Sequence, residues 1–424
     1  MLKHIFGRAV LLLLSLCLAT NAALADCDCE EVFYDLFVEF LNLPHGDSAL
    51  VSTQGGKTVL IDTGFGDGIE KIHTAISAEY YLRGKIDYLI GTHPSDESIG
   101  NMAKLIETAE VGSIYLSKAI FPTQSGQEIN AAAKKKGIRV NEITGSTTIK
   151  LNDEISIRFL PSNTDNTYIK LSYKNKSFLF VRGSKEITDQ EVMRLGASFK
   201  SDFLNISSYN NGSICDSFLK AVSPRFTVVS GKSTTFVYDS ILARLLKICD
   251  SEIRRTDRDG WISIDTDGHV FSSFTEVLFS RGDPEDGIVT LASSVLSGGN
   301  YSHENIWDKN PKTAWVEGNK EDGIGEFLEY GFFGKEPTIN SIGMINGYAK
   351  SVETYQNNNR VKTIRVSFGT GESYLFSLRD NEFQMQVFRL PKPIKDVKLL
   401  RITIVDVYKG KKYRDTCISE IAFN

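Results

Sequence analysis

The sequence has little histidine, which limits the metal chemistry that it can support. It contains His4, His45, His73, His93, His269 and His303 in 424 residues. A hydrolytic zinc is held by about three imidazole, thiolate or carboxylate ligands and keeps an open position for water. Three of the histidines in the middle of the chain fall in turns or on a predicted helix, where surface or packing roles are typical. This composition argues against a histidine-rich two-metal centre.

Long basic runs are also absent. The 48 Lys and Arg and 53 Asp and Glu give a formal charge of −5. The short cluster at 134–136 is interpreted as a solvated helix end. A mildly acidic chain without a basic stripe argues against nucleic acid as a general partner.

No apolar run in the sequence is long enough to span a membrane, and the run in the N-terminal leader is too short as well. Residues 1–25 combine Lys3 and Arg8 with an apolar run from Val10 to Leu18 and end in Ala-Leu-Ala, the pattern of a secretory signal peptide. Asp26, just before Cys27, argues against a lipoprotein site. The sequence therefore predicts an exported chain, periplasmic or extracellular, without a transmembrane helix after signal cleavage.

Cysteine is scarce as well. Beyond the leader the chain has Cys27, Cys29, Cys215, Cys249 and Cys417. An oxidising compartment permits disulfides. Cys215 begins one predicted helix and Cys249 ends the next, which predicts a bridge between them. The odd number leaves at least one free or intermolecular thiol.

Residues 31–275 alternate strand-like and helix-like apolar segments. Strands are predicted at 37–41, 49–51, 58–61 and 86–90, and helices at 69–82 and 101–108. This mixture predicts an α+β fold with four layers, αββα, in which helices lie outside two facing sheets.

The loop at 92–100 reads T-H-P-S-D-E-S-I-G and follows L-I-D-T-G at 60–64 and I-D-Y-L-I-G at 86–91. Together these segments resemble the metallo-β-lactamase fold, most closely the domain attached to bacterial competence-type DNA-uptake channels. The segment at 254–268 resembles the closing hairpin of that family. The resemblance implies a loop T-H-x-H-x-D-H-I-G-G around two cations.

Most ligands that the resemblance implies are replaced. The substituted positions are Ser95 and Ser98 for two histidines, Glu97 for the aspartate, Ser184 for the bridging acid, and Asn210 and Asn211 for a histidine pair. Neutral hydroxyls and amides are poor ligands for a hydrolytic metal. The pattern therefore argues against zinc and predicts a catalytically inactive, vestigial site.

Two interpretations of the remaining residues stay open. Asp62, in the D-T-G turn, is either a structural aspartate that accepts backbone N–H groups or a metal ligand. In the second case Asp62, His93, Asp96 and Glu97 hold one metal in a hydrolase of the nuclease or phosphodiesterase type.

Residues 276–288 form a polar linker, and short strands dominate residues 289–424, which predicts an antiparallel β-sandwich. The segment N-I-W-D-K-N-P-K-T-A-W at 305–315 resembles the opening of discoidin, or coagulation factor type C, domains. Motifs at 325–329, 345–348, 359–362 and 413–421 single out the glycan-binding domain of secreted NAD glycohydrolase toxins.

That resemblance implies two sites. Asp308, Thr313 and Glu420 match a structural calcium site of oxygen ligands, with a turn cap and an ordinary ion pair as the alternative. Aromatic faces and amides suit sugars, which predicts a glycan site at Tyr348, Tyr355, Asn357, Asn359 and Arg360. Trp315 is predicted to lie in the core.

The sequence thus predicts an exported, inactive metallo-β-lactamase-fold protein that binds a glycan or cell-surface ligand through its discoidin-like domain. Its N-terminal domain is then a scaffold or binds a protein partner. A metal-dependent hydrolase with a reduced ligand set is the alternative, and a host-directed adhesin is a third hypothesis.

Overall fold

The computed structural model describes most of the chain beyond the leader. The described residues are 34–78, 84–145, 147–207, 214–231, 241–242, 244–249, 251–269, 271–276, 288–332 and 336–424. The predicted signal peptide, Cys27, Cys29, Asn210, Asn211 and most of the predicted linker lie outside them. Among the described residues no helix is long and apolar enough to cross a membrane.

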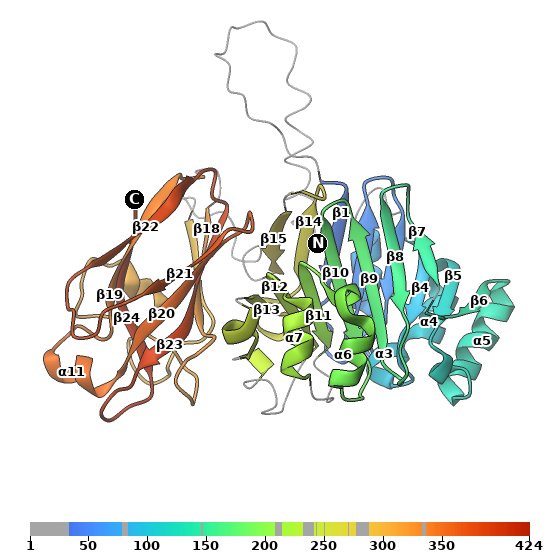
Figure 1. The fold of residues 1–424 in the computed structure, drawn as a ribbon, viewed down its shortest axis with the longest axis horizontal. Helices are drawn as coiled ribbons and strands as arrows, with labels where there is room; N and C mark the ends of the chain where they lie inside the picture. The colour runs from blue at the N-terminus through green and yellow to red at the C-terminus, as the bar shows by residue number, and fades with distance from the viewer. Residues whose placement is uncertain are drawn as a thin grey trace, which may run out of the picture.

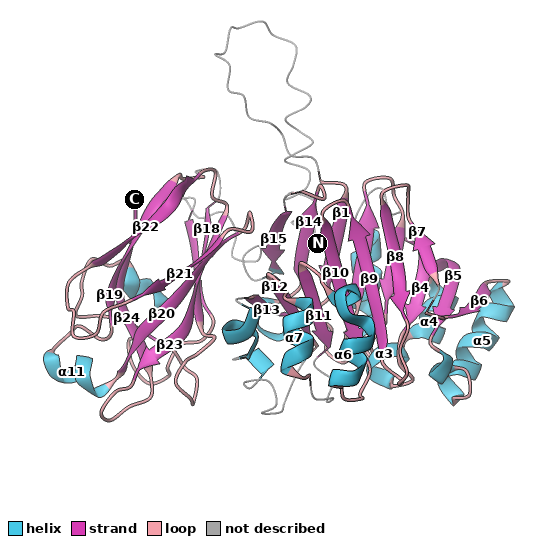
Figure 2. Ribbon diagram, in the orientation of Figure 1, coloured by secondary structure: helices cyan, strands magenta, loops and turns pink. Residues whose placement is uncertain are grey.

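Two mixed sheets form the N-terminal part (Figures 1 and 2). The first contains, in order, β15 (Phe271–Thr275), β14 (Ile262–Thr266), β1 (Leu36–Phe40), β2 (Ala49–Thr53), β3 (Thr58–Ile61), β4 (Lys85–Gly91), β5 (Glu110–Leu116) and β6 (Arg139–Glu142). The second contains β13 (Glu252–Arg255), β12 (Phe226–Ser230), β11 (Phe203–Ser207), β10 (Lys176–Arg182), β9 (Thr167–Tyr173), β8 (Ile155–Leu160) and β7 (Thr148–Lys150).

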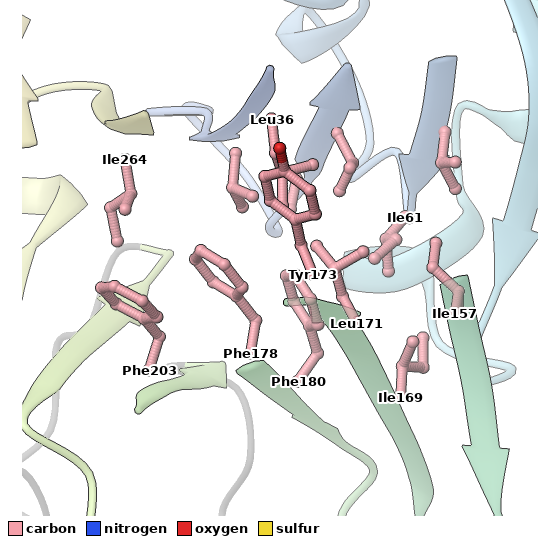
Figure 3. Close-up of a cluster of buried hydrophobic side chains, with 14 of the residues drawn as sticks. Leu36, Ile61, Ile157, Ile169, Leu171, Tyr173, Phe178, Phe180, Phe203 and Ile264 are labelled. Carbon is pink, nitrogen blue, oxygen red and sulfur yellow. The ribbon is translucent and has the colours of Figure 1, made fainter. Parts of the chain in front are cut away.

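The two sheets face each other across an apolar core (Figure 3). In β1, Leu36, Val38 and Phe40 are buried while the residues between them are half-buried, the alternation expected of a strand with one face inward. From the other sheet, Phe178 stacks on Phe203 with ring centroids 4.2 Å apart. This core joins the two sheets into one sandwich.

Helices cover both outer faces. They are α2 (Gly68–Ala78), α3 (Asp96–Ile99), α4 (Met102–Thr108), α5 (Gln124–Lys136), α6 (Asp189–Leu195), α7 (Asp216–Val222) and α9 (Thr256–Asp259), with the short helical turns η2 (Lys118–Ile120), η3 (Gly196–Phe199) and η4 (Leu245–Cys249). One apolar cluster joins the first sheet to α2, α4 and α5, and another joins the second sheet to α6 and α7. The predicted αββα layering is therefore confirmed.

The C-terminal part is an all-β sandwich, as predicted. Its strands are β16 (Ile288–Ala292), β17 (Trp315–Val316), β18 (Phe327–Phe332), β19 (Ile339–Asn346), β20 (Asn359–Phe368), β21 (Ser373–Ser377), β22 (Gln386–Ile394), β23 (Leu399–Tyr408) and β24 (Thr416–Phe423), with η5 (His303–Ile306) and α11 (Val352–Asn357). Trp315 is fully buried in its core.

The segment at 254–268 connects the two sheets of the sandwich instead of forming one hairpin. Its first strand, β13, is an edge of the second sheet, and α9 follows. Gly260, at φ 74°, leads into β14 of the first sheet, and Gly268, at φ 86°, makes the turn to β15. Glycine tolerates these left-handed conformations without a Cβ clash. The hairpin itself is β14–β15.

Candidate functional site

The site predicted from the metallo-β-lactamase resemblance begins where β3 and β4 end. Asp62 follows β3 and has a left-handed backbone, at φ 60°. Its carboxylate accepts hydrogen bonds from Thr92 N at 2.9 Å and from Thr92 Oγ1 at 2.7 Å. Asp62 is fully buried. It therefore ties together the two loops that end these strands, the geometry of a structural aspartate.

Arg182, at the end of β10, inserts its guanidinium between two buried acids. Its Nε lies 3.2 Å from Asp62 Oδ2 and 3.5 Å from Asp47 Oδ1, and all three side chains are at most 2% exposed. Burial raises the pKa of Asp62 to about 7, while the charge of Arg182 favours the ionised carboxylate. A fixed protein cation thus lies between two buried acids at the end of the sandwich where the sequence resemblance implies a metal site.

The buried polar cluster continues toward β11 and β12. Ser230 Oγ donates to Asp47 Oδ2 at 3.1 Å, and Asn205 Nδ2 donates to Ser230 Oγ at 3.1 Å. Two buried atoms, Arg182 Nη2 and Asn205 Oδ1, have no hydrogen-bond partner in the structure. An unpaired donor and acceptor in one interior cluster suit a bound water.

Sequence reasoning did not single out Asp47 or Asn205. Asp47 ends the Pro-His-Gly-Asp turn, in which Gly46 is required: a Cβ there would lie 2.3 Å from Glu97 O. That close approach packs the turn against the loop at 92–100, and Asp47 N donates to Glu97 O at 3.1 Å. The glycine before an acid, between two strands, was the signal that could have identified Asp47.

The other residues of the predicted site lie on the loop around α3 and at the start of the loop after β10. His93, Ser95 and Glu97 are half-buried, Asp96 and Ser184 are exposed, and Ser98 is buried. Burial lowers the pKa of His93, against the opposing charges of Asp165 and Glu97. The loop thus brings His93 near two carboxylates, whereas Asp62 is enclosed by Thr92 and Arg182. Within the described ranges, no group of three or more His, Cys, Asp or Glu side chains is arranged to hold a metal.

The residues of the predicted calcium site come together in the C-terminal domain. Thr313 Oγ1 donates to Asp308 Oδ2 at 2.6 Å. Burial and the neighbouring Asp308 raise the pKa of Glu420 to about 7, and Glu420 Oε1 is buried without a hydrogen-bond partner. Two converging acids with an unsatisfied oxygen are a donor set that fits a hard cation.

The predicted glycan residues divide into interior and surface positions. Tyr355, Asn359 and Arg360 are buried. Asn359 Nδ2 donates to Asp322 Oδ1 at 3.1 Å, and Arg360 binds both oxygens of Asp380, at 3.1 and 2.8 Å. Tyr348 and Asn357 keep partly exposed surface. The buried residues therefore hold the neighbouring loops in place. The half-exposed Tyr348 and Asn357 lie at the surface at or beside α11.

An exposed aromatic ring, Tyr413, lies on the neighbouring loop and was not predicted to bind glycan. Its side chain is 45% exposed, and its backbone N–H donates to Asn357 O at 2.8 Å. Two hydrogen bonds hold this loop against the domain. Gly410 N donates to Asn359 Oδ1 at 2.7 Å, and Arg414 Nε donates to Asp322 Oδ1 at 3.1 Å. Tyr413 therefore stands on a fixed loop next to α11.

The predicted bridge between Cys215 and Cys249 is not present in the structure. Both thiols are free. Cys215 Sγ lies 3.0 Å from Ser217 Oγ, and Cys249 Sγ donates to Leu219 O at 3.3 Å. Both side chains pack against the apolar layer beneath α7 as small hydrophobic groups. Packing therefore explains both cysteines without a crosslink.

Comparisons with known proteins match the two parts of the chain separately. Residues 285–424 match the family model of the NAD glycohydrolase translocation F5/8 type C domain. ComE operon protein 3 of Bacillus subtilis (strain 168) is 24% identical over 252 residues, which are 53% of this chain and 32% of that protein. The chain thus spans about a third of its relative. Both resemblances drawn from the sequence motifs are confirmed.

Solved structures of both kinds are similar to this chain. The metallo-β-lactamase fold protein YhfI from Bacillus subtilis is 12% identical, with a TM-score of 0.40, over 52% of this chain and 96% of its own. The family 32 carbohydrate-binding module of NanJ from C. perfringens, in complex with galactose, is 18% identical, with a TM-score of 0.26, over 33% of this chain and 96% of its own. The chain combines a metallo-β-lactamase-fold region with an F5/8 type C domain.

Proposed function

We propose that this protein is exported, is catalytically inactive, and attaches to a glycan-bearing surface through its C-terminal domain. One observation carries the inactivity: the guanidinium of Arg182 is held by Asp62 and Asp47 in the interior of the sandwich, beside the loop at 92–100. A fixed cation there repels a metal ion, and the serines of the α3 loop offer no strong ligand in its place. The N-terminal domain then serves as a scaffold or binds a protein partner.

Glycan binding is supported by the F5/8 type C domain and by the surface beside α11. Tyr413 offers a partly exposed ring on a braced loop, with Lys412 Nζ 5.0 Å from the ring centroid, and Asn357 offers an amide nearby. Sugars are bound by such pairs, in which a ring packs against C–H groups and an amide bonds a hydroxyl.

Asp308, Thr313 and Glu420 would hold a structural calcium ion in this proposal. Bound there, calcium would supply the positive charge that two neighbouring acids need. The ion would brace the loop after η5 against β24, and no role in a reaction is assigned to it.

The alternative hydrolase is favoured by the neighbourhood of His93, which lies near the carboxylates of Glu97 and Asp165. A single transition metal at that point would have fewer protein ligands than a hydrolytic zinc normally has. Asp62 could join such a site only by leaving Thr92 and Arg182.

One experiment separates the two functions. The purified mature chain is assayed for bound zinc, manganese and calcium, for phosphodiester cleavage with added zinc or manganese, and for binding on a glycan array. We expect glycan binding without turnover and without a stoichiometric transition metal. Chelator-sensitive cleavage that His93→Ala abolishes would establish the hydrolase instead, and a blank glycan array would reject the attachment role.

A further inference from the structure

The edge of the second sheet lies against the C-terminal domain. Strand β13 has β12 on one side and, among the described strands of that sheet, no strand on the other. Two carbonyl groups on the open side, one in β13 and one just before it, are bound by arginines of the C-terminal domain. Arg401 Nη1 donates to Ile253 O at 3.0 Å, and Arg365 donates to Ser251 O. Carbonyl groups two residues apart on a strand point to the same side. The two arginines therefore donate hydrogen bonds where a further strand would otherwise do so.

The two arginines are spaced to match that edge. Arg365 lies on β20 and Arg401 on the adjacent β23, where Arg401 is paired with Ser367, two residues beyond Arg365. Both side chains are at most 1% exposed. The face of the C-terminal sheet is therefore complementary to the backbone of β13.

A buried ion network surrounds these contacts. Arg401 binds Glu329 at 2.6 Å and Asp259 at 2.9 Å, and Arg254 binds Glu252 at 2.8 Å and also contacts Glu329. None of these five side chains is more than 6% exposed. Removing one partner from such a buried network leaves an uncompensated charge, which is strongly unfavourable. Each domain thus supplies charges that the other must neutralise.

The backbone of Gly371 also lies close to side chains of the N-terminal domain at the rim of this junction. Arg225 donates to Gly371 O from the N-terminal side. A Cβ at Gly371 would lie 2.3 Å from the ring of Phe271 in β15, and Gly371 has φ 92°. Glycine is therefore required at 371 for both its conformation and this contact.

We propose that the C-terminal domain is a permanent cap on the β13 edge, so that the two domains act as one rigid binding unit. The cap protects an edge strand that would otherwise pair with another chain. It also fixes α11 of the C-terminal domain relative to α3 of the N-terminal domain, and the two helices lie toward the same side of the molecule (Figure 1). A surface bound at the α11 end would then face the α3 loop as well.

Small-angle X-ray scattering and thermal unfolding of the full mature chain test this proposal. We expect the wild-type chain to scatter as one rigid particle and to unfold in a single transition. The double variant Arg365→Met/Arg401→Met should have a larger maximum dimension and should unfold in two transitions. The matched control is Lys362→Met/Lys392→Met, whose exposed ion pairs with Asp406 and Glu372 lie within the C-terminal domain; it should behave as wild type.

Because unpaired Glu329 and Asp259 could prevent the double variant from folding, a second variant removes their charges too: Arg365→Met/Arg401→Met/Glu329→Gln/Asp259→Asn. A wild-type chain that scatters as two independently moving domains would overturn the proposal without any variant. Unchanged scattering and unfolding in the neutralised variant would also overturn it. Glycan binding by the wild-type chain is measured in a separate experiment. The presence or absence of that binding does not affect the test of the rigid junction.

Discussion

Arg182 Nε donates a hydrogen bond to Asp62 Oδ2 at 3.2 Å, across the interior of the metallo-β-lactamase-type sandwich. The two residues are 120 positions apart and come from different sheets. Asp47 shares the same guanidinium. The pair links the two sheets at the end of the sandwich that carries the loop at 92–100, and it has consequences for stability.

Removing the cation should destabilise the N-terminal domain. Arg182→Met leaves Asp62 and Asp47 buried without their positive partner, and breaking a buried pair typically costs about 3–5 kcal/mol. Denaturant unfolding would measure the loss. The triple variant Arg182→Met/Asp47→Asn/Asp62→Asn should recover part of it, and Arg158→Met, at an exposed position of β8, should change little. A loss no larger than that of Arg158→Met would show that the ion pair has no structural role.

Stability should depend on pH through Glu317. This side chain is fully buried, and burial raises its pKa to about 7, although the backbone N–H groups of Thr416 and Asn319 favour the ionised form. The folded state therefore holds the proton more tightly than the unfolded state. The associated stability is complete below about pH 4.5, the unfolded value, and is lost as pH rises through 7.

Glu317→Gln, which cannot ionise, should escape that loss. Between pH 5 and pH 8 the unfolding free energy of the wild type should fall by about 1–3 kcal/mol relative to that of the variant. Urea unfolding at both pH values would measure it. Glu353→Gln removes a charge from the exposed side of α11 and is the control. Parallel pH curves for wild type and Glu317→Gln would contradict the assignment.

Calcium should stabilise the C-terminal domain. At a concentration about 100 times the dissociation constant, a specific ligand adds about 2.7 kcal/mol. Thermal unfolding with calcium and with chelator would report this shift. Asp308→Asn/Glu420→Gln should abolish the shift, whereas Glu304→Gln, on the exposed side of η5, should keep it. A calcium response that survives in the double variant would place the ion elsewhere.

Glycan affinity should depend on Tyr413. Tyr413→Ala removes the exposed ring beside α11 and should weaken binding about tenfold, the equivalent of about 1.4 kcal/mol. Val387→Ala removes a similarly exposed apolar side chain from β22 and should leave binding unchanged. Titration of a glycan found on the array would compare them. Equal affinities for Tyr413→Ala and wild type would move the site away from this loop.

Sequence patterns alone determined the two folds, and they predict a site with few strong metal ligands. Alternating burial in β1 and the turn glycines at 260 and 268 follow from local rules, because strand period and backbone conformation depend on neighbouring residues. The serines at 95, 98 and 184 stand where the resemblance implies stronger ligands, and the absence of a catalytic metal stays a prediction. Likewise, the buried position of Trp315 was predicted from its place in the discoidin motif and is confirmed.

Only the tertiary structure decided what each polar side chain contacts. Asn359 and Arg360 have the composition of a sugar site, yet the loop carrying Gly410 and the acids Asp322 and Asp380 use their polar atoms inside the domain. Arg182 meets Asp62, and Arg401 meets Asp259, across large sequence separations. Such pairs are set by how sheets and domains pack, and packing brings together residues whose sequence neighbours carry no sign of the partner.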